Sequence, residues 1–184
     1  MIGIPLLVFG AFFLIGWLNL FHAHEHCIKQ TGLLLRVYAT EHGGRFPTDT
    51  NGFGDAILLL LKANSEDDAR LFTAPGDDGN VLKQSLRTAA HVQERQCTRA
   101  YVQGLSETNN PMIAIVFDRY PTHGGDHFRR PWGPLLREVC LLDGSMEVVR
   151  EVKWSEFRRT QIDLLVAEGR DRARAEMLYE PSSQ

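Results

Sequence analysis

The chain is poor in cysteine and has no excess of basic charge. Its 184 residues include three cysteines, Cys27, Cys97 and Cys140, and carry a formal net charge of −3. An odd number of cysteines leaves at least one thiol outside any set of intrachain bridges, which argues against a disulfide-stapled scaffold. Nucleic-acid binding, which usually needs a basic face, is not expected either. We expect Cys140 to be a small buried side chain. A disulfide between Cys27 and Cys97 is the one pairing left open.

The short motifs of common enzymes are missing as well. The sequence contains no phosphate loop, no GxGxxG, no HExxH and no serine in a GxSxG elbow. Low-complexity tracts and internal repeats are also absent. Hydrophobic content of 43% and charged content of 23% are ordinary for a globular domain. We therefore expect a folded protein without catalytic activity.

Charged residues are absent from the first apolar run, Ile2 to Phe21. A helix of about 20 residues crosses the roughly 30 Å hydrocarbon core of a bilayer. We therefore predict a transmembrane anchor over residues 1–26 of a single-pass protein. Two alternatives are a cleaved signal peptide, which usually opens with a basic region that is missing here, and a buried core helix.

A second apolar pattern follows over residues 27–42 and has the period of an amphipathic helix. Its apolar stripe consists of Ile28, Thr31, Gly32, Leu35 and Ala39, widened by Leu34, Val37 and Tyr38. Gly43-Gly44 ends the pattern, because glycine readily adopts the left-handed conformation of a helix stop. We expect one long helix over residues 1–42, with a transmembrane half and an amphipathic half that packs against a soluble domain.

The rest of the chain predicts short helices and then strands. Helices are expected at 56–63 and 82–90, and strand-length apolar stretches lie at 99–103, 112–118, 136–142 and 146–150. Asp143-Gly144 is a hairpin signal between the last two stretches. Ser155 is expected to cap a C-terminal helix, and the chain past Gly169 to fray. This order predicts an α+β fold in which an antiparallel β-meander of three to four strands covers the long helix.

The expected organisation is an anchor at 1–26, a globular domain at 27–168 and a charged tail at 169–184. Within the globular domain, a glycine- and proline-rich loop over residues 123–134 carries ligand-type side chains. The candidate metal ligands are Asp118, His123, Asp126 and His127. Calcium, which prefers carboxylate and backbone oxygens, is the cofactor left open, and a simple turn is the alternative.

A second cluster of ligand-type residues occupies positions 22–27. On a helix, His22 and His26 share a face at metal-ligand spacing. The alternative is a polar collar at a membrane interface.

Several segments resemble, in order, the pseudopilins of type II secretion systems, and more closely their divergent relatives in planctomycete-type bacteria. They are CIKQTGLLLRVYATEHGGRFP, LFTAPGDD, AYVQGLS, IVFDRYPTHGG, and VCLLDGSMEVV followed by WSEF. The resemblance implies a pilin-like fold and a structural or interaction protein. A component of a type II secretion system is one such function. The resemblance also implies an inner-membrane protein whose globular domain is extracytoplasmic, with the bilayer, pilin-like subunits or secretion-system proteins as partners.

The chain departs from that family at its start. Gly10 is followed by Ala-Phe-Phe-Leu-Ile15, without the family's Glu at the fifth mature position, and no basic residue precedes Gly10. Lys29 and Arg36 follow the apolar run, and positive-inside counting favours a cytoplasmic domain. We follow the resemblance here and expect the globular domain to be extracytoplasmic.

Two other functions stay open from the sequence. One is a membrane-tethered metal-binding or enzymatic domain that uses the His123–His127 loop with Asp118. The other is a sensor or adaptor domain that faces the cytoplasm.

Overall fold

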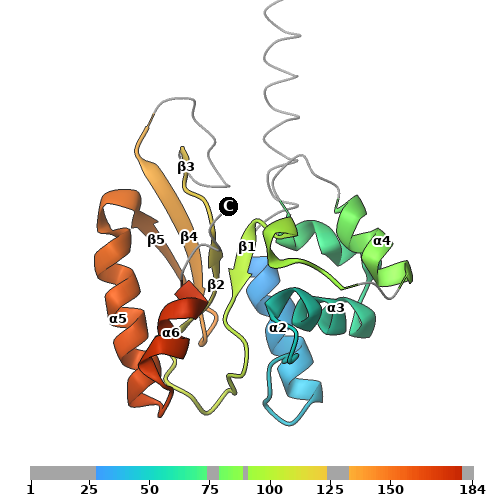
Figure 1. Ribbon diagram of the computed structural model, residues 1–184, viewed down its shortest axis with the longest axis horizontal. Helices are drawn as coiled ribbons and strands as arrows, with labels where there is room; N and C mark the ends of the chain where they lie inside the picture. The colour runs from blue at the N-terminus through green and yellow to red at the C-terminus, as the bar shows by residue number, and fades with distance from the viewer. Residues whose placement is uncertain (1–27, 74–78, 89–90, 124–132, 180–184) are drawn as a thin grey trace, which may run out of the picture.

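The computed structural model describes residues 28–179 except 74–78, 89–90 and 124–132 (Figure 1). The predicted anchor and the cluster at 22–27 lie outside this part of the chain. Across the described residues, no helix is long and apolar enough to span a membrane. This finding contradicts the predicted single-pass protein of the inner membrane. Two of the described helices are α2 (Ile28–Glu41) and α5 (Trp154–Ala167), each with 14 described residues.

The α+β class is confirmed. The other helices are α3 (Phe53–Ala63), α4 (Asn80–Thr88) and α6 (Arg172–Tyr179), with short 3-10 helices η2 (Glu66–Phe72), η3 (Glu94–Gln96) and η4 (Glu151–Lys153). The strands are β1 (Arg99–Tyr101), β2 (Ala114–Asp118), β3 (Thr122–His123), β4 (Leu135–Leu141) and β5 (Met146–Arg150). All strand pairs are antiparallel, with β4 paired to β2, β3 and β5.

The sheet lies between two helical layers. Figure 1 shows α2, α3 and α4 on one side of the strands and α5 with α6 on the other. Val116 pairs with Cys140, and Phe117 pairs with Val139. Because side chains alternate along a strand, neighbouring pairs face opposite layers. All five residues of β2 are therefore buried, which explains why this strand reads as a continuous apolar run.

The predicted inner stripe of α2 is confirmed, since its five residues are the buried ones of this helix. Gly32 lies at a close approach of the helix to β4, because a Cβ built there would be 2.3 Å from Cys140 Sγ. Gly43 and Gly44 adopt φ angles of 65° and 79° and end the helix as expected. Val37, which was predicted to widen the buried stripe, is instead 42% exposed.

The C-terminal part of the chain differs from the prediction. Residues 172–179 form α6 instead of fraying, with Ala175 and Tyr179 buried. The Tyr179 ring stacks on Phe117 with centroids 5.1 Å apart, and its hydroxyl donates to Ala114 O at 3.1 Å. Helix α5 begins at Trp154, before Ser155, and its N-cap makes no side-chain hydrogen bond. The predicted serine cap is therefore wrong.

Candidate functional site

The two described candidates for metal binding lie in different surroundings. Asp118, at the end of β2, is buried; its Oδ1 is 3.5 Å from Arg99 Nε and its Oδ2 accepts the Glu138 amide at 2.8 Å. His123 is exposed, and its Nδ1 lies 2.9 Å from Gly133 O. Asp126 and His127 fall in the undescribed segment 124–132. No group of three or more His, Cys, Asp or Glu side chains within the described ranges is placed to hold a metal ion, so the calcium site stays a prediction.

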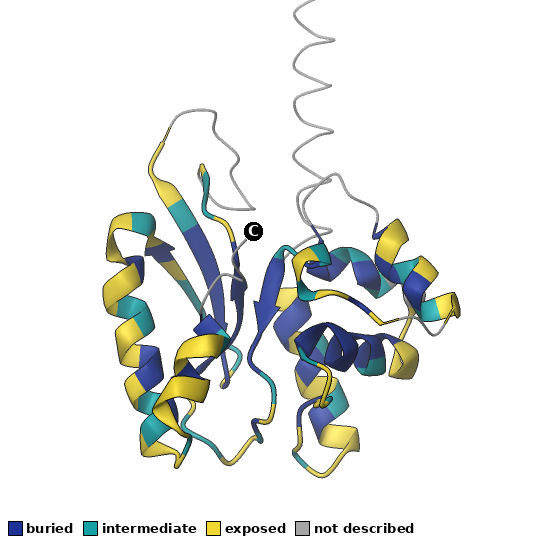
Figure 2. Ribbon diagram, in the orientation of Figure 1, coloured by how far each residue is buried: buried dark blue, intermediate teal, exposed yellow. Residues whose placement is uncertain are grey.

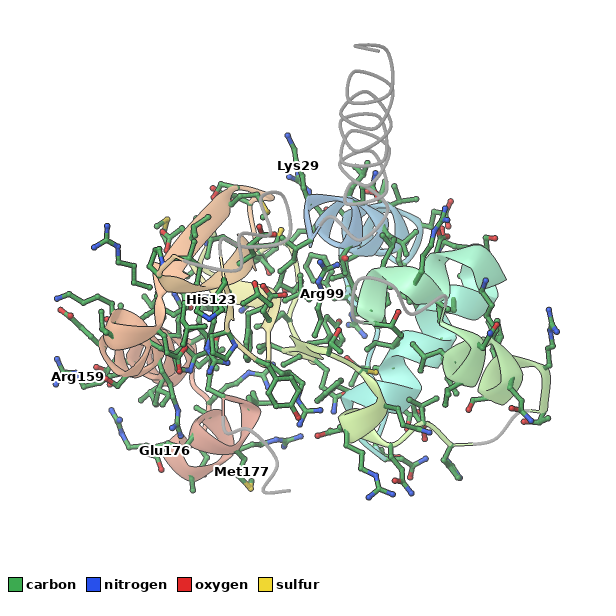
Figure 3. All side chains as sticks on the ribbon, turned by 90° about the horizontal axis from the view of Figure 1, so that it is seen from above. Lys29, Arg99, His123, Arg159, Glu176 and Met177 are labelled. Carbon is green, nitrogen blue, oxygen red and sulfur yellow. The ribbon has the colours of Figure 1, made fainter. Side chains whose placement is uncertain are left out.

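The side chain of Arg99 pairs with the Asp118 carboxylate, which was a candidate metal ligand. This arginine is 1% exposed, and Figure 3 shows it in the interior of the molecule. Its Nη1 donates to Thr31 Oγ1 at 3.0 Å and to Leu71 O at 2.6 Å. A buried guanidinium needs such partners because an unpaired buried charge is strongly destabilising. Arg99 therefore joins β1 to β2, α2 and η2, and we assign this cluster a structural role.

A second buried arginine lies on the other face of the sheet. Arg137 donates from Nε and Nη2 to the two carboxylate oxygens of Glu151, at 2.6 and 3.0 Å, and its guanidinium lies 4.7 Å from the Trp154 ring centroid. The hydrogen bond from Arg137 lowers the pKa of Glu151. A pocket of about 50 Å³ lies next to these side chains. It has room for no more than a few waters and is smaller than most ligand sites.

A groove of about 520 Å³ lies at the C-terminal end of α2. It is lined by Tyr38, His42, Arg45, Phe46, Thr48, Gly104, Leu105 and Ser106. The Tyr38 and His42 rings stack with centroids 3.7 Å apart, and His42 Nδ1 is 2.8 Å from Tyr38 O. No carboxylate or thiol is among the lining residues, so this groove offers contact surface but no acid–base pair.

The outer face of α2 is the candidate site that the geometry favours. It consists of Lys29, Gln30, Leu33, Val37 and Thr40, which are all exposed. Leu33 and Val37 are 64% and 42% exposed, and they are neighbours on the surface because they are four residues apart on a helix. Figure 3 shows Lys29 pointing away from the body of the molecule. Helix α2 therefore has apolar residues on both its inner and its outer side.

Two of the contacts of this helix fix it to β4 and to the β4–β5 turn. Gly32 permits close packing on β4, and Arg36 Nη1 donates to Asp143 O at 2.5 Å in the β4–β5 turn. The outer face is therefore presented on a helix fixed to the sheet, which favours a defined interface. The sequence pattern included Val37 among inward residues and left Leu33 unassigned. The sequence did carry one signal of this outer face, because the apolar residues of α2 spread over more than one side of the helix.

No family model, curated protein or solved structure matches this chain. The resemblance to pseudopilins stays a prediction from the sequence.

Proposed function

We propose that this protein is a pseudopilin-like structural or interaction protein that binds another subunit through the outer face of α2. The partner surface is a helix with an apolar stripe, as in a pilin-like subunit or a protein of a type II secretion system. The protein acts by presenting this face and not by catalysis.

The observation that carries the proposal is the exposure of Leu33 and Val37 on a helix whose opposite side is already buried. Full burial of a leucine or valine side chain contributes about 1.5–3 kcal/mol each. Docking of a helix on this face would recover the part of that free energy that corresponds to their exposed area. The basic side chain of Lys29 at the margin favours a partner with a carboxylate at the corresponding position.

The arrangement of α2 on the sheet is the second support. A pilin-like fold requires a helix packed on an antiparallel meander, and α2 contacts β2 and β4. The β4–β5 hairpin, which carries the Leu-Asp-Gly sequence of the resemblance, is bound to α2 through Arg36. The buried carboxylates of Asp118 and Glu138 lie away from the outer face of α2 and accordingly take no part in the proposed docking.

Site-specific photo-crosslinking in the native host tests the proposal. A photoreactive residue replaces Leu33 in the full chain, and the matched control carries it at Val152, which is 84% exposed beyond β5. We expect crosslinks to a pilin-like or secretion-system protein from position 33 and their loss in a Val37→Asp chain. Equal crosslinking from positions 33 and 152, or products unaffected by Val37→Asp, would contradict the proposal.

A further inference from the structure

Strand β5 forms an edge of the sheet as far as the structure describes the chain. Among the described strands it pairs with β4 alone. Its central residue, Val148, is 58% exposed. Sheet edges are commonly protected by proline, bulges, charges or a covering segment, because unpaired strands invite pairing with other chains. β5 has no proline, and its register with β4 is continuous over five residue pairs.

The hairpin geometry decides which backbone groups of β5 face away from β4. The amide of Leu141 donates to Ser145 O at 2.9 Å, so these residues form a hydrogen-bonded pair. Bonded and non-bonded pairs alternate along an antiparallel ladder. The register then places three residues at non-bonded positions, with N–H and C=O directed outward: Met146, Val148 and Arg150.

An open groove of about 330 Å³ lies between this edge and α5. It is lined by Val148, Val149, Arg150, Lys153, Glu156, Phe157 and Thr160. The groove combines an apolar floor with charges of both signs, and Lys153 Nζ lies 3.0 Å from Glu156. A surface of this kind can meet its own copy across a two-fold axis, because each acid can face a base of the other molecule.

We propose that β5 pairs antiparallel with β5 of a second copy of this chain, so that the sheet continues across a two-fold axis. The outward N–H and C=O groups of each strand bond to those of the other. This interface is separate from the outer face of α2 and does not depend on the function proposed above.

The charges select one register for the pairing. With Val148 opposite Val148 of the second copy, Met146 lies opposite Arg150 and Glu147 opposite Val149. Sliding one strand by two residues in either direction keeps the outward backbone groups paired. It places Glu147 opposite Glu147 of the second copy in one direction and opposite Glu151 in the other. Like charges directly opposite each other destabilise a strand pair. In the selected register, Glu147 shares a face with Val149 and enters the groove of the other copy near Lys153.

Charge reversal at the two-fold axis tests this pairing. Two differently tagged full-length chains are co-expressed and co-purified. Val148→Lys in both chains places two ammonium groups opposite each other, and Val148→Glu in both places two carboxylates there. One chain of each kind restores an attractive pair. Val152→Lys is the matched control, because Val152 is exposed but lies beyond β5. Thermal melting checks that each variant folds.

We expect the wild-type chains to co-purify, the two like-charged pairs to lose about tenfold or more in affinity, and the mixed pair to recover it. The control should associate like the wild type. Wild-type chains that do not associate, association that survives Val148→Lys, or a mixed pair that does not recover would each overturn the proposal. None of these results alters the crosslinks expected from Leu33, so the two proposals fail independently.

Discussion

At the scale of single residues, Gly32 decides how closely α2 approaches the sheet. Any side chain at this position meets Cys140 Sγ, 2.3 Å from an ideal Cβ. Glycine is otherwise unfavourable within a helix by about 1 kcal/mol relative to alanine. Its presence in the inner stripe is therefore explained by packing against β4.

Gly32→Ala is expected to lower the free energy of unfolding by up to about 2 kcal/mol, because an overpacking cost of about 1–3 kcal/mol outweighs a gain of about 1 kcal/mol in helix propensity. Cys140→Ala in the same chain removes the clashing sulfur, so the double variant should be more stable than the sum of the single effects predicts. Urea unfolding measures each change. Gln30→Ala, at an exposed position of the same helix, is the control and should stay within about 0.5 kcal/mol. A stabilising Gly32→Ala would contradict this account.

A second residue-level feature is the pair of Asp55 and His91. Asp55 Oδ1 accepts the Val92 amide at 2.9 Å, and Oδ2 lies 2.6 Å from His91 Nδ1. Burial acts to raise the pKa of Asp55, but the hydrogen bonds from Val92 and His91 outweigh it and lower that pKa. The hydrogen bond to Asp55 raises the pKa of His91. The pair therefore ties the segment before η3 to the start of α3 in a pH-dependent way.

The contribution of His91 to stability is complete below its unfolded pKa of about 6.5 and is lost as pH rises through its higher folded pKa. The contribution of Asp55 is present above about pH 4 and is lost as pH falls through its lowered folded pKa. We therefore expect the wild type to melt at a higher temperature than His91→Gln at pH 6, and this difference to shrink at pH 8. An equal difference at both pH values would refute the assignment.

At the scale of elements, α6 is the piece that the sequence pattern missed. Arg172–Tyr179 contains two buried residues, Ala175 and Tyr179, spaced by one helical turn. Figure 2 shows the remaining surface of this helix largely exposed. Two buried residues in a helix of this length give only a weak helical period in the sequence. Tertiary packing on Phe117 stabilises the helix, because isolated helices of this length are marginal in water.

Truncation of the Tyr179 side chain measures that packing. Tyr179→Ala is expected to cost about 3–5 kcal/mol through loss of the buried ring. Tyr179→Phe removes the hydrogen bond to Ala114 O and should cost about 0.5–1.5 kcal/mol. Chemical unfolding gives both values. Met177→Ala, at a 65% exposed position of the same helix, is the control. If Tyr179→Ala proves as mild as this control, the helix does not contribute to the core.

At the scale of the whole molecule, helices cover both faces of the sheet and bury the two described cysteines. Cys97 and Cys140 are both buried, with 0% and 1% exposure. Burial raises the pKa of Cys97 to about 12. The thiolate is the reactive form, so this fold protects both sulfurs. Cys140 is the small buried side chain that its apolar neighbours predicted, and Cys97 forms no disulfide with another described residue.

Thiol labelling tests the integrity of this arrangement. In a full chain with Cys27→Ser, we expect no fast reaction with a disulfide reagent at pH 8. Unfolding in guanidinium should expose two reactive thiols. The reaction is followed by absorbance, with free cysteine as the reference for an exposed thiol. Labelling of the folded chain at the reference rate would show that the two layers do not close over the sheet.

Local chemistry explains what could be predicted. The stripe of α2, the stop at Gly43-Gly44 and the β4–β5 hairpin at Asp143-Gly144 depend on helical period and turn preference within a few residues. All three are found in the structure. The single-pass membrane prediction is contradicted in the described residues. Of the four proposed metal ligands, Asp118 is paired with Arg99, which no local pattern indicates because the two residues lie 19 positions apart.

The sequence by itself determined the α+β class, the helix with a buried stripe and the antiparallel hairpin, because these follow from periodicity and turns between near neighbours. Only the tertiary structure decided that α6 closes the second face of the sheet, that Leu33 and Val37 stay exposed, and that no other described strand pairs with the outer edge of β5. Each of these outcomes depends on which distant segments compete to cover the same apolar surface. That competition is settled by packing across the whole molecule, and no short stretch of sequence records it.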